Sequence, residues 1–138
     1  MNRPTVVFDT NVLVAELAFP EESPDCVALA EDGAVEAALS PSLCREFAAV
    51  LADDRLPHPA DRRAETVERV VAFAHVVEPA VEIDAAADPD DDAVLECAVA
   101  AAADGVVSDD HHLRDCDGVA GVAVRTREAF LDRDAGHL

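Results

Sequence analysis

The sequence contains no lysine, and all ten of its basic residues are arginine. This absence disfavours phosphoacceptor receiver domains and haloacid-dehalogenase-type phosphatases, because both rely on a lysine in the active site. No apolar run reaches the ~18 residues that a membrane-spanning helix needs, so no membrane segment is expected. Residues 1–4 show neither the apolar core nor the cleavage site of a secretory signal. We therefore expect a cytoplasmic protein that does not enter a membrane.

The four cysteines, at positions 26, 44, 97 and 116, include no CxxC pair and have no histidine at a zinc-ligand spacing. In a cytoplasmic protein this pattern predicts buried, reduced thiols rather than disulfides or a zinc site. His111 and His112 are adjacent in sequence, and we interpret both as surface residues that could line a nearby site.

Acidic residues outnumber basic ones by 30 to ten, which gives a formal net charge of −20. Self-repulsion at this charge density opposes compaction, whereas ~1 M salt shortens the Debye length to about 3 Å and screens it. We therefore hypothesise a protein adapted to high salt, as in a haloarchaeon, rather than one that is simply acidic. The acidity does not by itself exclude a nucleic-acid partner, because the arginines remain available for local phosphate contacts.

The length of 138 residues and a hydrophobic fraction of 51% fit one domain, spanning residues 1–138. Short apolar runs alternate with helical patterns, which predicts an α/β fold with a mostly parallel sheet flanked by helices. We expect strands at about 4–9, 34–39, 75–78, 105–108 and 121–125. We expect helices at about 10–18, 23–32, 41–52, 60–74, 90–103, 110–115 and 126–132.

Asp9 directly follows Val6-Val7-Phe8, which has the composition of a strand buried on both faces. The residue therefore falls at the carboxyl end of an expected central strand, where open α/β sheets place ligands. An unpaired charge buried there would be costly, so Asp9 requires a metal ion or another compensating partner.

Glu46 lies inside the apolar stripe of the helix expected at 41–52, three residues after Leu43 and four before Val50. A carboxylate on a core face is costly unless it is paired or coordinates a cation. An ion pair with Arg45 or another arginine is the structural alternative to a functional role for Glu46.

A run of acidic residues, Asp88 and Asp90–Asp92, opens the helix expected at 90–103. The helix dipole accounts for one or two acidic residues at this position. Asp91 shares a face with Leu95 and Ala98 at helical spacing, so we expect it to project toward the sheet while Asp90 and Asp92 point away.

Asp110 follows the buried strand expected at 105–108, as Asp9 follows the first strand. A role as helix N-cap would also explain it, with Ser108 and Asp109 as equal candidates. Neighbouring parallel strands would bring Asp9 and Asp110 together, and four converging carboxylates cannot all ionise at neutral pH without a cation. Mg²⁺ or Mn²⁺ binds through carboxylates and water, so a divalent metal site is predicted.

Four segments together resemble the motifs of PIN domains, and most closely those of the VapC-like toxins of toxin–antitoxin systems. They are residues 8–13 (FDTNVL), 40–47 (SPSLCREF), 88–98 (DPDDDAVLECA) and 103–110 (ADGVVSDD). The resemblance covers nearly the whole chain, in the family's order. It implies a three-layer α/β/α fold with a mostly parallel five-stranded sheet, and a metal-dependent ribonuclease that cleaves RNA by hydrolysis.

The resemblance also assigns roles to individual residues. It implies that an acidic quartet holds Mg²⁺ or Mn²⁺ and performs catalysis: Asp9, Glu46, Asp91 and Asp110. Supporting polar positions are matched by Thr10, Asn11 and Ser108, and Asp92 stands where asparagine is frequent. Because Asp91 and Asp92 are adjacent, either could be the third carboxylate. Asp109 departs from the family pattern by adding a negative charge beside the site.

Partners follow from the same resemblance: an RNA substrate, an antitoxin protein that occludes the site, and a second copy of the chain in a homodimer. The non-enzymatic alternative is a PIN-like binding module with a weak or inactive site, which the presence of all four acids disfavours. The arginines at positions 62, 63 and 69 could contact RNA or an acidic neighbour, but a solvated helix face is the favoured interpretation. Phosphatases of the haloacid-dehalogenase type also need an aspartate where this chain has Asn11.

Overall fold

In a computed structural model, residues 3–19, 25–53, 55–56 and 60–134 are described, with the side chains of residues 133 and 134 excepted. Over these residues the chain forms a five-stranded sheet in which every pairing is parallel, in the order β3-β2-β1-β4-β5. The strands are β1 (Thr5–Phe8), β2 (Glu36–Leu39), β3 (Ala74–Val76), β4 (Gly105–Val107) and β5 (Val124–Arg125). The α/β class and the parallel sheet predicted from the sequence are confirmed.

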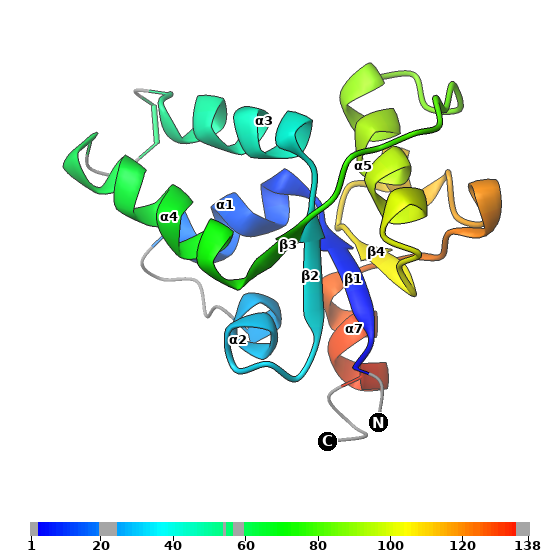
Figure 1. Cartoon of the computed structure of the whole chain (residues 1–138), viewed down its shortest axis with the longest axis horizontal. Helices are drawn as coiled ribbons and strands as arrows, with labels where there is room; N and C mark the ends of the chain where they lie inside the picture. The colour runs from blue at the N-terminus through cyan, green and yellow to red at the C-terminus, as the bar shows by residue number, and fades with distance from the viewer. Residues whose placement is uncertain (1–2, 20–24, 54, 57–59, 135–138) are drawn as a thin grey trace.

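Helices cover both faces of this sheet, as Figure 1 shows. They are α1 (Thr10–Ala18), α2 (Asp25–Glu31), α3 (Pro41–Leu51), α4 (Arg63–Phe73), α5 (Pro89–Ala100), α6 (His111–Arg114) and α7 (Arg127–Asp134). Short 3₁₀ turns lie at Ala60–Arg62 and Val119–Gly121. Helix α5 packs against β1, β2 and β4, whereas α7 packs against β5 and α2.

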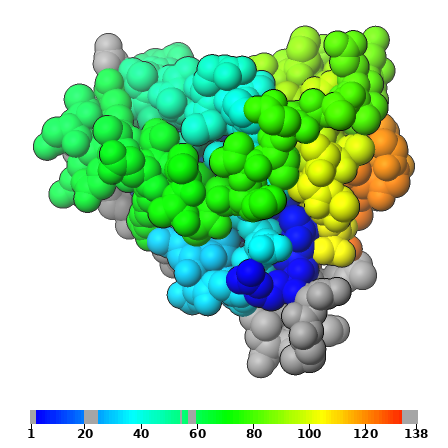
Figure 2. Space-filling view, in the orientation of Figure 1, coloured from blue at the N-terminus to red at the C-terminus, as the bar shows by residue number. Residues whose placement is uncertain are grey.

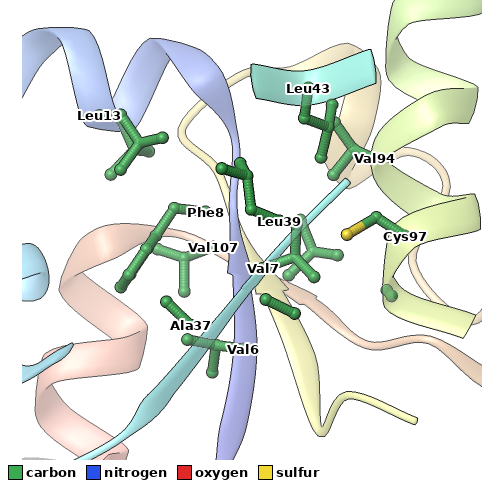
Figure 3. Close-up of a cluster of buried hydrophobic side chains, with 14 of the residues drawn as sticks. Val6, Val7, Phe8, Leu13, Ala37, Leu39, Leu43, Val94, Cys97 and Val107 are labelled. Atoms are coloured by element: carbon green, nitrogen blue, oxygen red, sulfur yellow. The ribbon is translucent and has the colours of Figure 1, made fainter. Parts of the chain in front are cut away.

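The core lies on both sides of β1. Val7 is fully buried and Phe8 is 2% exposed, because β1 is central and covered on both faces. The Phe8 ring meets that of Phe130 in α7 edge to face, with centroids 6.2 Å apart. Figure 3 shows Val94 and Cys97 of α5 on one side of the sheet and Leu13 of α1 on the other. The apolar composition of the first strand therefore reflects burial from two directions.

Local sequence signals explain where the helices of the site begin. The Ser40 hydroxyl accepts a hydrogen bond from Leu43 N at 3.2 Å, and Pro41 is the first residue of α3. Asp88 accepts from Asp90 N at 2.9 Å, ahead of Pro89 at the start of α5. Both N-caps predicted from the sequence are confirmed.

The structure departs from the predicted elements mainly near the carboxyl end. The strand expected at 121–125 is reduced to β5, because Gly118 and Gly121 have positive φ angles of 90° and 79° and turn the chain there. Strand β3 begins one residue earlier than expected, at Ala74. Helix α2 begins at Asp25, and the predicted start at 23–24 lies outside the described residues.

The segment that follows β3 crosses the face of the molecule shown in Figure 2, in green, before it reaches α5. This segment, residues 77–88, lies largely outside regular secondary structure. Its course determines the surroundings of the first turn of α5. Among the described helices, none combines the length and the apolar character needed to cross a bilayer.

Candidate active site

The predicted carboxylates gather at the edge of the sheet where the parallel strands end. Strands β1 and β4 are direct neighbours, with Phe8 aligned with Val107, so the residues that follow them come to the same edge. Asp9 follows β1 at once, and Asp110 comes three residues after β4. Figure 1 shows α3 and α5 on opposite sides of this edge, and they supply Glu46 and Asp91.

Asp9 is the N-cap of α1 and is only 4% exposed. Its Oδ1 accepts a hydrogen bond from the backbone N–H of Asn11 at 3.4 Å, and its Oδ2 accepts from Ser108 Oγ at 2.8 Å. Burial raises the pKa of Asp9, the Ser108 hydrogen bond partly opposes this rise, and the charge of Asp110 adds to it. The carboxylate is thus oriented by the protein but short of compensating positive charge.

Ser108 links the two strand ends. The residue is fully buried, and its hydroxyl donates to Asp9 while accepting from the backbone N–H of Asp110 at 3.0 Å. The Asp110 carboxylate in turn accepts from His112 N at 2.9 Å, as the N-cap of α6. Ser108 therefore ties the orientation of Asp9 to the backbone at Asp110.

Glu46 is half-buried at the edge of the apolar stripe of α3, whose centre is formed by Leu43 and Phe47. Its Oε1 accepts a hydrogen bond from Thr10 Oγ1 at 3.1 Å, which connects α3 to α1. Burial raises the pKa of Glu46, and the nearby charges of Asp90 and Asp9 raise it further. The effect of the Asp9 charge on Glu46 agrees with the prediction that the two carboxylates lie near each other.

Asp91 projects from the first turn of α5 and is half-buried. Burial and the charge of Asp110 raise its pKa to about 6, with smaller contributions from Asp88 and Asp9. Asp91 also lines a cavity of about 430 Å³ together with Asp110 and His112. The electrostatic coupling thus joins all four predicted acids.

Asp92 is buried, contrary to the expectation that it points away into solvent. Its Oδ1 accepts hydrogen bonds from the backbone N–H groups of Ala85 at 3.0 Å and of Ala86 at 2.8 Å. The sequence could not indicate this contact, because it depends on the path of the segment before α5. Asp92 is oriented toward that segment, whereas Asp91 faces the other carboxylates.

Asn11 contributes to the site through its backbone, since its N–H contacts Asp9 and the residue itself is exposed. It lines a second cavity, of about 240 Å³, with Asp109, Asp110 and Arg127. Arg127 donates from Nε to Asp109 Oδ2 at 2.8 Å, and the pKa of Asp109 is lowered by its contacts with Arg127. The extra charge at Asp109 is therefore compensated locally.

Sequence reasoning missed two contributors to this site. Asp88 and Asp90 act on Glu46, because α3 packs against α5 and brings the first turn of α5 close to it. His112 lines the cavity beside Asp91, as its expected place at the surface near a site suggested, and it partly opposes the rise in the pKa of Asp91. The acidic run was visible in the sequence, but only tertiary packing shows which carboxylate it faces.

A divalent cation suits this arrangement of residues. The side chains that converge offer carboxylate oxygens, which are hard ligands. The pKa values of Asp9, Glu46 and Asp91 are raised first by burial and then by the charges of neighbouring carboxylates. A bound cation would reverse this electrostatic strain, because it favours the ionised form of each carboxylate. Ser108 and Thr10 are placed to hold two of these carboxylates in one orientation.

Comparison with known proteins gives one assignment. A family model described as a PIN domain matches residues 5–112, which contain all four of these acids. A search of curated proteins finds no match.

Proposed function

Because the chain belongs to the PIN domain family, whose members are generally nucleases, we propose that it is a metal-dependent endoribonuclease. The observation that carries this proposal is the coupling of four carboxylates at one edge of the sheet, with raised pKa values at Asp9, Glu46 and Asp91. Metal-dependent hydrolysis of an RNA phosphodiester bond needs a site that holds cations against a phosphate, and this arrangement supports such a site.

Asp9, Asp91 and Asp110 would hold the principal Mg²⁺ or Mn²⁺, directly or through water. Glu46 would hold a second ion or orient the attacking water. When bound, the cation supplies a nucleophile near neutral pH and stabilises the charge that develops on the phosphate oxygens.

The protein's own contribution is to orient these groups in advance. Ser108 donates to Asp9 and accepts from the backbone of Asp110, so it keeps the two ligands in one relative position. Thr10 donates to Glu46 and so holds this carboxylate in one orientation, while burial raises the pKa of Glu46 and the Thr10 hydrogen bond partly opposes the rise. Cleavage by this route leaves a 5′-phosphate and a 3′-hydroxyl, because water attacks in place of the RNA 2′-hydroxyl.

We further propose that the protein is the toxin component of a toxin–antitoxin system, similar to VapC toxins. The support is the likeness of its four motifs to those toxins, over residues 8–13, 40–47, 88–98 and 103–110. In this proposal residues 1–138 are one cytoplasmic PIN-like domain, which forms a homodimer and is inhibited by an antitoxin that occludes the acidic site. The net charge of −20 supports an origin in a haloarchaeon.

Replacement of Asp9 by asparagine tests the enzymatic part of the proposal. Asparagine is an equally good N-cap, so Asp9→Asn retains the start of α1 while removing the charge. We expect cleavage of single-stranded RNA with Mn²⁺ to fall by more than about 100-fold, because a cation ligand is lost. Circular dichroism should show an unchanged fold.

Asp32→Asn is the matched control, because Asp32 is an exposed aspartate in the loop after α2. Its activity should equal that of the wild type. Undiminished Mn²⁺-dependent cleavage by Asp9→Asn would contradict the assignment. RNA binding without cleavage by the wild type would favour the binding-module alternative.

A further inference from the structure

Beside the acidic quartet, the structure brings together a group of a different chemical type. Potential metal-ligand atoms of Asp110, His111 and His112 all lie within 4.8 Å of one another. The two imidazole rings lie with their centroids 4.0 Å apart and their planes tilted by 37°. Adjacent residues of a helix ordinarily point in different directions, so this approach of two rings is a distinct feature of the turn that opens α6.

The backbone fixes one member of the group and leaves the other two adjustable. The Asp110 carboxylate is held by the hydrogen bond from His112 N at 2.9 Å. Both histidines are exposed, so their rings can rotate to close around an ion without repacking the core. A shift of this kind is needed, because ligand atoms around a zinc ion stand about 3.3 Å apart, as bond lengths of ~2.0 Å and a tetrahedral angle require.

We propose that Asp110, His111 and His112 form a second cation site, selective for a borderline transition metal such as Zn²⁺. Imidazole nitrogens suit Zn²⁺, Ni²⁺ and Cu²⁺, whereas Mg²⁺ prefers oxygen ligands alone. Two imidazoles and one carboxylate therefore discriminate between the cations. The carboxylates of Asp9, Glu46 and Asp91 offer oxygen ligands alone, so they favour Mg²⁺ instead.

The acidic quartet and the proposed second site share Asp110, so an ion in the second site affects the quartet. An ion held by Asp110 with the two histidines takes this carboxylate away from the quartet, or adds a positive charge next to it. His112 and Asp110 also line the cavity that contains Asp91, so a bound ion occupies its wall. Zn²⁺ would therefore antagonise Mg²⁺-dependent cleavage, a consequence that rests on the proposed nuclease function, whereas Zn²⁺ binding itself does not.

The test is calorimetric titration of the untagged full chain with Zn²⁺ alone, at neutral pH. The double variant His111→Asn/His112→Asn should bind Zn²⁺ at least 10-fold more weakly than the wild type. Co²⁺ serves as a spectroscopic substitute for Zn²⁺. When Co²⁺ is added to the double variant, its visible absorption should lack the bands from nitrogen ligands that the wild type shows. Equal Zn²⁺ affinity in the wild type and the double variant would overturn the proposal.

His75→Asn is the matched control, because His75 is another exposed histidine but lies away from the proposed site. It belongs to β3, the outermost strand on one side of the sheet, whereas α6 lies between β4 and β5 in the chain, on the other side. Its Zn²⁺ affinity should equal that of the wild type, and a loss equal to that of the double variant would show nonspecific binding and refute the site.

Asp9→Asn separates this inference from the proposed function. The variant retains Asp110 and both histidines, so it should keep a Zn²⁺ affinity within about 3-fold of the wild type even though it no longer cleaves RNA. If the wild type proves not to be a nuclease, the Zn²⁺ titration still decides the second site. A 10-fold or greater loss of Zn²⁺ affinity in Asp9→Asn would instead place the ion in the quartet and contradict the proposal.

Discussion

At the scale of single residues, Asp91 and Asp92 show how neighbouring identical side chains take opposite roles. Asp92 is buried and accepts two backbone hydrogen bonds from Ala85 and Ala86. Asp91 is half-buried among like charges, and its pKa is raised to about 6. The ionised form of Asp91 thus destabilises the metal-free fold, whereas the Asp92 carboxylate supports it through its two hydrogen bonds.

The first prediction concerns Asp91→Asn in metal-free protein, with EDTA present. The folded-state pKa of about 6 exceeds the unfolded value of 3.8, so this group's stabilising contribution is fully present below pH 3.8 and is lost as pH rises through 6. At pH 7 the variant should therefore unfold at higher urea than the wild type, by about 1 kcal/mol after allowance for solvent screening. At pH 5 the difference should fall to roughly half of its value at pH 7, and it should vanish only below pH 3.8.

Asp92→Asn provides the comparison for Asp91→Asn. It should lower the free energy of unfolding by about 1 kcal/mol at pH 7, because the hydrogen bonds at Ala85 and Ala86 lose a charged acceptor. A loss of Mn²⁺ affinity in Asp92→Asn but not in Asp91→Asn would reverse the assignment of the third carboxylate.

The second prediction concerns Ser108→Ala. The variant removes the hydrogen bond that lowers the pKa of Asp9 and leaves the Asp110 N–H without its partner. We expect Mn²⁺ affinity to fall about 10- to 100-fold, and stability to fall by about 1–2 kcal/mol. Mn²⁺ titration and urea unfolding measure the two effects, and Ser42→Ala, at an exposed position of α3, should change neither.

At the scale of elements, a buried ion pair joins α1 to α7. The side chain of Glu16 is 1% exposed, and its Oε2 lies 3.3 Å from Arg127 Nη1. Glu16 Oε1 also accepts from the backbone N–H of Val27 at 2.9 Å, which adds α2 to the connection. Arg127 contacts Asp109 as well, one residue before Asp110, so this pair supports the wall of the candidate site.

The third prediction is that Arg127→Met costs about 3 kcal/mol of stability, because it leaves the Glu16 charge buried without its cation. Addition of Glu16→Gln should recover part of the loss, since glutamine is neutral and still accepts from Val27. A double-mutant cycle in urea measures both. Arg3→Met removes the exposed pair with Glu36 and should cost less than about 1 kcal/mol, so an equal cost for both arginines would refute this explanation.

Element positions were predictable where the signal was local. The N-caps Ser40 and Asp88, each followed by proline, marked helix starts that the structure confirms. The strand expected at 121–125 was too long, because apolar residues there suggested a strand while Gly118 and Gly121 impose turns. Contacts between elements, such as Glu46 beside Asp90, were not predictable because no local pattern specifies how α3 meets α5.

At the scale of the whole molecule, the net charge of −20 dominates the response to solvent. The fourth prediction is that the melting temperature rises between 0.1 M and 2 M KCl, because the Debye length falls from about 10 Å at 0.1 M to about 3 Å at 1 M. A rise of at least about 4 °C is expected, equivalent to ~1 kcal/mol at this chain length. Sucrose at equal osmolality is the control for nonionic stabilisation, and a melt no less stable at low salt would oppose adaptation to high salt.

The amino-acid sequence by itself determined the alternation of strands and helices, and it indicated which acids stand at strand ends, because burial period and capping are local properties of the chain. It also predicted that Asp9 and Asp110 meet, since parallel neighbours end at one edge of the sheet. Only the tertiary structure decided that Asp91 rather than Asp92 faces the other carboxylates, and that His112 stands beside them. These contacts depend on the packing of α3 against α5 and on the path of residues 77–88. Both bring together parts of the chain that are distant in sequence, so no local sequence pattern specifies them.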